Sequence, residues 1–138
     1  MNSNYLIGTD PELFLTDNTN KIISAINKIP GTKHNPYKPE HLSSGFGLQT
    51  DNILVEFNIP PIQQENQLLT NINITKDYIS EYLIKHNYYV NQAYLASAIV
   101  EEDQLYDIQA LEFGCDPDYS CYTVKQNKPP KLQNPYLS

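Results

Sequence analysis

Residues 50–61, TDNILVEFNIPP, decide the fold, because they are typical of one buried strand of about eight residues with a carboxylate at its centre. A period of two places Ile53, Val55 and Phe57 on one face of this strand and Glu56 on the other. The double proline that follows ends the strand, since proline cannot donate to a ladder. An unpaired carboxylate in such a strand costs several kcal/mol, so we expect Glu56 to have a cation, a donor cluster or a route to water.

The length and composition indicate one globular domain. At 138 residues, with 40% hydrophobic and 18% charged residues, the chain is long enough to bury a core. We expect a single domain over residues 1–138, with residues 124–138 as an extended tail. No apolar run approaches the roughly 20 residues that span a bilayer, and the N-terminus lacks the pattern of a signal peptide. These features predict a cytoplasmic protein that does not bind a membrane.

The charge argues against nucleic-acid binding. The net charge is −7, and all nine basic residues are lysines. A nucleic-acid ligand needs a basic face, and phosphate groups are usually gripped by the forked side chain of arginine. If the protein binds a nucleotide, the positive charge has to come from metal ions, lysines or another polypeptide.

Cysteine and histidine give no pattern that is typical of zinc sites. Cys115 and Cys121 stand alone with five residues between them, which predicts two reduced structural thiols. No short metal-binding spacing joins the three histidines.

The first half of the chain predicts a hairpin followed by an irregular loop. A strand at 5–10, a polar turn at 16–20 and a returning strand at 21–25 form the hairpin, which contains Glu12. Glu12 is then either a site residue or a solvated charge at a strand end. The proline-rich segment 27–47 predicts a loop that contains Lys33, and this loop is either a lid or phosphate contact, or an ordinary surface loop.

The second half predicts one long helix and one further strand. Residues 63–86 carry an apolar stripe at helical spacing, which should pack on one face of the sheet. The stripe consists of Leu68, Leu69, Ile72, Ile79, Tyr82 and Leu83. Residues 88–100 fit either a strand or a short helix, and 101–103 an acidic turn. Residues 104–113 predict a strand that ends at Glu112, before a Gly-Cys-Asp-Pro-Asp loop.

Three acids are therefore expected on strands or at strand ends: Glu12, Glu56 and Glu112. Four aspartates stand close to them in the sequence: Asp10, Asp51, Asp116 and Asp118. Hard oxygen ligands of this kind are typical of Mg²⁺ or Mn²⁺ sites that bind nucleotide phosphates.

Four motifs in order resemble the phage-encoded COOH-NH2 ligase-type proteins, a branch of the glutamine synthetase and glutamate-cysteine ligase superfamily. They are IGTDPELFL (7–15), IPGTK (29–33), QTDNILVEFNIPP (49–61) and EFGCDPDY (112–119). The resemblance implies an α+β fold, in which a long helix covers one face of an antiparallel sheet, as half of a glutamine synthetase-like catalytic domain. It also implies ATP- and Mg²⁺-dependent joining of a carboxylate to an amine through an acyl phosphate.

The resemblance also assigns residues. Glu12 and Glu56 are expected as catalytic metal ligands, and Glu112 as a further ligand or a substrate contact. Lys33 and Asn58 are the candidate nucleotide-binding residues. The substrates are expected to be a small-molecule or peptide amine and a carboxylate.

The chain departs from this family at its end. Family members continue past the segment that matches NPYLS (134–138) into a glycine- and histidine-containing strand and a second half with further ligands and basic contacts. The sequence therefore predicts an incomplete site that needs a complementary polypeptide or a homo-oligomer. One alternative is that the chain is a truncated remnant of such a ligase. The other is a non-catalytic phage protein that binds a host or phage partner through its acidic sheet surface or an open sheet edge.

Overall fold

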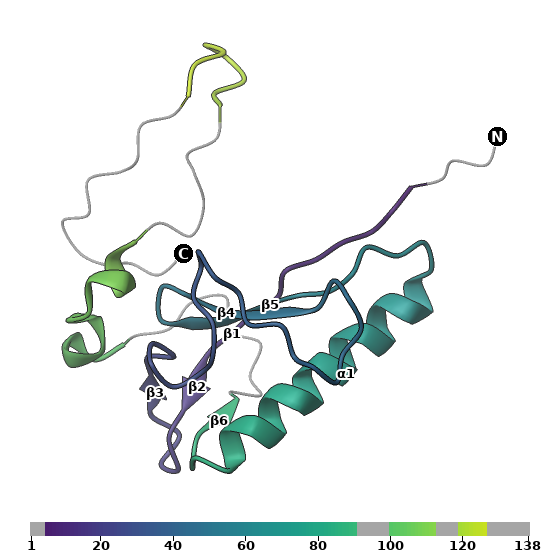
Figure 1. The fold of residues 1–138 in the computed structure, drawn as a ribbon. Helices are drawn as coiled ribbons and strands as arrows, with labels where there is room; N and C mark the ends of the chain where they lie inside the picture. The colour runs from purple at the N-terminus through teal and green to yellow at the C-terminus, as the bar shows by residue number, and fades with distance from the viewer. Residues whose placement is uncertain (1–4, 91–99, 113–118, 127–138) are drawn as a thin grey trace.

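The computed structural model describes residues 5–90, 100–112 and 119–126. Within them the chain forms two small antiparallel sheets and one long helix, so the predicted α+β class is confirmed (Figure 1). No described helix combines the length and the apolar character that crossing a membrane requires.

The first sheet contains β1 (Glu12–Leu13), β4 (Gly47–Asp51) and β5 (Leu54–Asn58), in the order β1-β5-β4. The prediction that 50–61 forms one strand was wrong. The chain reverses between Asp51 and Leu54, which pair across a two-residue turn in which Asn52 has a φ of 52°. Asparagine tolerates this left-handed conformation better than most residues. Asp51 therefore ends β4 instead of beginning β5.

The second sheet contains β2 (Leu15–Thr16), β3 (Ile22–Ile23) and β6 (Tyr89–Val90), with β2 in the centre. The turn between β2 and β3 forms because the Asp17 carboxylate accepts hydrogen bonds from the Thr19 and Lys21 backbone N–H groups. The predicted hairpin is confirmed for its turn and returning strand. The strand predicted at 5–10 is wrong, since Ile7 makes only an isolated bridge to Ile62.

Only Phe14 separates β1 from β2. The short run of residues 12–16 therefore joins the two sheets, because its first two residues pair in the first sheet and its last two pair in the second. Leu15, at the centre of the second sheet, is fully buried and faces both Ile23 and Val90.

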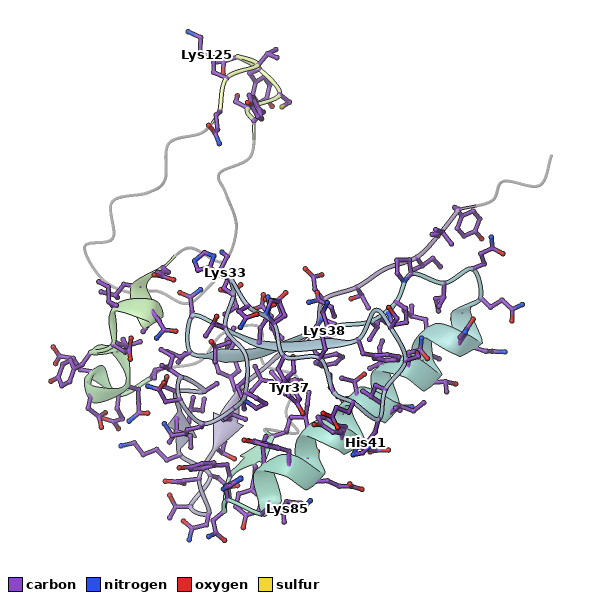
Figure 2. All side chains as sticks on the ribbon, viewed as in Figure 1. Lys33, Tyr37, Lys38, His41, Lys85 and Lys125 are labelled. Carbon is purple, nitrogen blue, oxygen red and sulfur yellow. The ribbon has the colours of Figure 1, made fainter. Side chains whose placement is uncertain are left out.

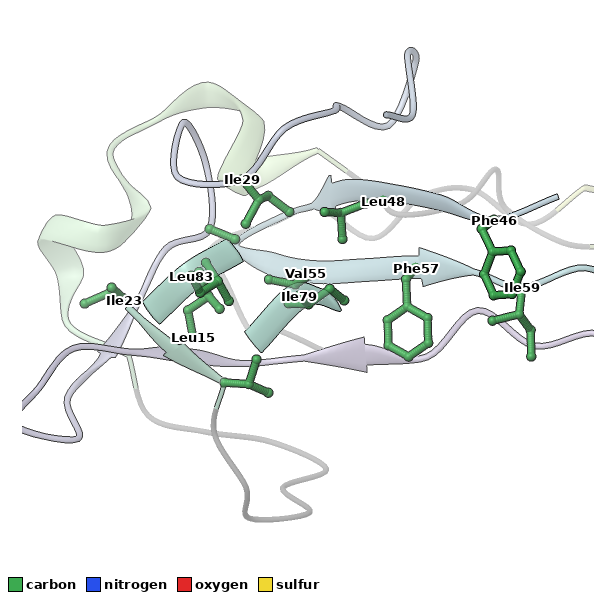
Figure 3. Close-up of a cluster of buried hydrophobic side chains, with 12 residues drawn as sticks. Leu15, Ile23, Ile29, Phe46, Leu48, Val55, Phe57, Ile59, Ile79 and Leu83 are labelled. Carbon is green, nitrogen blue, oxygen red and sulfur yellow. The ribbon is translucent and has the colours of Figure 1, made fainter. Parts of the chain in front are cut away.

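The long helix is α1 (Glu65–Ile84), as predicted, and it packs against one face of the sheets. Ile79 and Leu83 are fully buried, and they join Leu15, Val55 and Phe57 in the main core (Figure 3). Burial of Leu69 was predicted wrongly, since this side chain is 53% exposed. Two polar residues of α1 are buried in addition, and the Thr75 hydroxyl donates to the Asn71 carbonyl at 2.8 Å.

The strand predicted at 104–113 is wrong, because this segment forms two short 3₁₀ helices, η1 (Glu102–Leu105) and η2 (Ile108–Leu111). The Asp107 carboxylate accepts a hydrogen bond from the Gln109 backbone N–H at 3.0 Å, which favours a helical start. Ala110 of η2 contacts Ile26 and Ile53 in a second, smaller core cluster.

Several predictions fall on residues outside the described ranges. The choice between strand and helix at 88–100 is settled only for β6, because 91–99 are not described. The loop at 114–118 and the tail from 127 onward also lie outside these ranges.

The irregular loop at 27–47 is confirmed, and its second half is attached to the edge of β4. Tyr37 and Leu48 exchange two backbone hydrogen bonds, each of 2.8 Å. Gly31 has a φ of 88°, and a side chain there would collide with the Leu48 carbonyl and the Tyr37 backbone. The loop residues next to Gly31 are therefore held close to the sheet.

Candidate functional site

Glu12 and Glu56 lie directly opposite each other in the first sheet. The register pairs Glu12 of β1 with Glu56 of β5, and Glu56 in turn with Gln49 of β4. Residues opposite each other in an antiparallel pair project from the same face, with Cβ atoms about 4.5–5.5 Å apart. The two glutamates that were predicted to converge therefore do lie side by side.

The three side chains of this row differ in exposure. Glu56 and Gln49 are both buried, whereas Glu12 is exposed. The Gln49 Nε2 donates to Glu56 Oε2 at 2.8 Å, so the buried carboxylate has one amide donor. Asp51 lies two residues after Gln49 in β4, on the same face by the period of two, and is also buried.

Both glutamates have a raised pKa. Burial is the main cause for Glu56, followed by the nearby carboxylates of Asp51 and Asp10, while the Gln49 hydrogen bond acts in the opposite direction. Although the Glu12 residue is exposed, the surrounding protein partly desolvates its carboxyl group, and this comes first in raising its pKa, followed by the carboxylates of Asp51, Glu56 and Asp10. We call Asp10, Glu12, Asp51 and Glu56 the carboxylate cluster. Repulsion between like charges makes such a cluster hold protons or cations more readily than isolated carboxylates do.

A pocket of about 230 Å³ adjoins one member of this cluster. It is lined by residues 32–34 of the loop, by 50–52 at the end of β4, and by Gln109 and Glu112 around η2. Asp51 belongs both to the pocket wall and to the carboxylate cluster. Figure 2 shows Lys33 on the loop beside the sheet, far from Lys85 at the end of α1.

The predicted site residues thus fall into two groups. Glu12 and Glu56 face each other, whereas Lys33 and Glu112 line the pocket. Asn58 is half-buried two residues after Glu56, on the same sheet face and opposite Gly47. The expected place of Glu112 at a strand end was wrong, because it follows η2 and is exposed.

The described His, Cys, Asp and Glu side chains include no group of three or more that could hold a metal ion. Asp116 and Asp118 lie outside the described residues, as does Cys115. Cys121 is a free thiol, but it is exposed, so it does not serve as a buried structural residue.

Sequence reasoning missed Gln49 as a partner of Glu56 and Asp51 as the residue shared by cluster and pocket. Both follow from the position of the turn. Once Asn52 is placed in a two-residue reversal, counting back from it puts Gln49 opposite Glu56. His34, which also lines the pocket, had no sequence signal beyond its place beside Lys33.

Comparison of the chain with protein-family models, with curated proteins and with solved structures gives no match. The carboxylate cluster and the pocket are therefore the features of the described residues that bear on function.

Proposed function

We propose that this protein is an ATP- and Mg²⁺-dependent carboxylate–amine ligase-like protein whose site is completed by a second polypeptide. The observation that supports the proposal best is the direct pairing of Glu12 with Glu56, with the pKa of each raised. Perturbed carboxylates that converge on one sheet face are typical of functional sites. On this proposal the fold is half of a glutamine synthetase-like catalytic domain in the cytoplasm.

Glu12 and Glu56 suit Mg²⁺ better than a metal ion that takes all of its ligands from the protein. Mg²⁺ keeps several waters and is commonly held by one or two carboxylates together with substrate phosphates, so two glutamates are sufficient. When bound, the ion would neutralise negative charge on the phosphates. Glu12 and Glu56 would hold it, and Glu112 would act from the pocket as a further ligand or a substrate contact.

The other proposed roles concern positioning. Lys33 would bind nucleotide phosphate from the loop, and Asn58 would contribute an amide on the same face as Glu56. The substrate carboxylate would take the terminal phosphoryl group of ATP to give an acyl phosphate and ADP. The amine would then displace phosphate, forming the amide bond and losing a proton. Catalysis would come from proximity and from charge neutralisation.

A second polypeptide is proposed because the chain is poor in cations. It has nine lysines and no arginine, against 16 acidic residues. Phosphoryl transfer needs several positive groups around the phosphates. A complementary polypeptide or a second copy of the chain would supply them. If a complementary polypeptide supplies them, the isolated chain should neither hydrolyse ATP nor form amide bonds until that polypeptide is added.

The test is metal-dependent stabilisation of the folded chain. About 10 mM Mg²⁺ should raise the free energy of unfolding by about 1.4 kcal/mol if the Kd is tenfold lower than this concentration. The Glu12→Gln/Glu56→Gln variant should lose the effect, and a Glu40→Gln/Glu65→Gln control, outside the cluster, should keep it. Mn²⁺ should also broaden the NMR signals of Gln49 and Asn58. Equal stabilisation of both double variants, or none of the wild type, would refute the metal site.

A second candidate function is partner binding without catalysis. Among the described residues, β1 pairs with β5 along one side only and stands at the edge of its sheet. A short open edge can accept a strand from another protein. This candidate predicts that a bound partner is retained by the Glu12→Gln/Glu56→Gln variant, and that Mg²⁺ and ATP have no effect on stability.

A further inference from the structure

The pocket beside β4 combines both signs of charge on walls that come from separate parts of the chain. The loop wall contributes Lys33 and His34, whereas the end of β4 contributes Asp51 and the end of η2 contributes Glu112. The carboxylates therefore stand on the sheet and η2 sides of the pocket, and the basic side chains stand on the loop side.

A ligand with a single charge is poorly matched to these walls. An anion would be attracted by Lys33 and repelled by Asp51 and Glu112, and a simple cation would meet the reverse. A zwitterion can place an ammonium group against the carboxylates and a carboxylate against the basic side chains. The Lys33 ammonium has three N–H donors, so it can bind a ligand carboxylate while it keeps other contacts.

The uncharged lining fits the same kind of ligand. Asn52 and Gln109 offer amide donors and acceptors, and Thr32 and Thr50 offer hydroxyl groups. The volume of about 230 Å³ is much larger than one water molecule requires, so the pocket has room for a short amino acid.

We infer that the pocket between the 32–34 loop, the end of β4 and η2 binds a small zwitterion of the amino acid class. Its ammonium group contacts Asp51 and Glu112, and its carboxylate contacts Lys33 and His34. The inference stands on the pocket alone and does not depend on the proposed ligase function. Binding is therefore measured without Mg²⁺ and without ATP.

Three small probes of similar length separate the charge requirements: γ-aminobutyrate carries both charges, butylamine only the positive one and butyrate only the negative one. L-2-aminobutyrate, with both charges on adjacent carbons, tests whether an α-amino acid is preferred. Each is titrated into the isotope-labelled chain while the backbone NMR signals are followed. We expect at least one zwitterion to bind about tenfold or more tightly than either singly charged probe, and to shift the signals of Asn52 and Gln109.

Variants locate the binding. Glu112→Gln and Lys33→Met should each weaken zwitterion binding about fivefold or more, while the exposed controls Glu40→Gln and Lys38→Met leave it unchanged. If Lys33→Met perturbs folding, Glu112→Gln decides, because this side chain is exposed and its replacement is close in size. Zwitterions that bind no better than butylamine or butyrate would overturn the inference. So would shifts outside the pocket, or equal affinity in Glu112→Gln and its control.

Discussion

The two faces of the first sheet bury comparable side chains with opposite energetic results. Along β5, Val55 and Phe57 are fully buried in the main core, and Glu56 between them is only 7% exposed on the other face. Burial of Phe57 stabilises the fold by about 1.5–3 kcal/mol. Burial of Glu56 instead raises its pKa, which means that the charged form is disfavoured. The comparison teaches that burial alone does not measure stability; the chemistry of the buried group sets the sign.

The largest expected effect comes from removing an apolar side chain on the core face. Phe57→Ala should lower the free energy of unfolding by about 3–5 kcal/mol, because a fully buried aromatic ring leaves a cavity. Asn58 is its neighbour and is half-buried on the other face. Asn58→Ala should lower the free energy of unfolding by less than about 1 kcal/mol. Urea unfolding monitored by circular dichroism measures both. Similar losses for the two variants would show that the faces do not differ as described.

A pair of identical substitutions in α1 sharpens the comparison on the helix side. Leu83→Ala should lower the free energy of unfolding by about 2–5 kcal/mol, because Leu83 is fully buried. Leu69→Ala should change it by about 0.5 kcal/mol or less, because Leu69 is 53% exposed. Thermal unfolding of the two variants tests whether the helix surface that packs on the sheet has been identified correctly. A larger loss for Leu69→Ala would reverse the assignment.

On the carboxylate face we expect a smaller effect than those of Phe57→Ala and Leu83→Ala, and one of the opposite sign. The folded protein keeps protons on Glu12 and Glu56 above their ordinary pKa of 4.5, so its free energy of unfolding should fall as pH rises through the raised values. Asp17 has a lowered pKa and acts below its ordinary value of 3.8, outside this window. These two glutamates should therefore make the wild-type protein less stable at about pH 8 than at about pH 5.

The Glu12→Gln/Glu56→Gln variant isolates this contribution. At about pH 8 without metal ions it should be more stable than wild type by about 1 kcal/mol, because the amides remove charges that burial and the neighbouring carboxylates disfavour. Urea titrations of both proteins at the two pH values give the difference, in which the unchanged histidines largely cancel. A variant that is less stable than wild type at the higher pH would contradict a repulsive cluster.

The sequence predicted the elements whose pattern is local. The helix α1 and the turn after Thr16 are both present as predicted, because each depends on side chains within a few residues of one another. The turn at Asn52 was missed because Ile53, which lies in the turn, has the same apolar alternation as Val55 and Phe57 in the strand that follows. The strand predicted at 104–113 failed for a related reason: Asp107 bonds the Gln109 backbone N–H and starts a 3₁₀ turn within an apolar segment.

The candidate site was predictable only in part. Glu56 was identified because a carboxylate amid apolar residues stands out in any sequence, and Glu12 was paired with it through family resemblance. The contacts of Asp51 and Gln49 depend on strand register, which a single misplaced turn changes completely. Lys33 and Glu112 line the same pocket because segments about 80 residues apart pack together, and no local sequence pattern encodes that packing.

The run of residues 12–16, which belongs to both sheets, has a mechanical consequence. Glu12 and Leu15 lie in strands that are separated by a single residue, so a ligand that immobilises Glu12 should also restrain the centre of the other sheet. Backbone amides of Leu15 and Val90 should then exchange more slowly with deuterated solvent, although neither residue touches the ligand. Binding at the exposed Glu12 carboxylate would therefore reduce local opening in β2, whose two residues are buried.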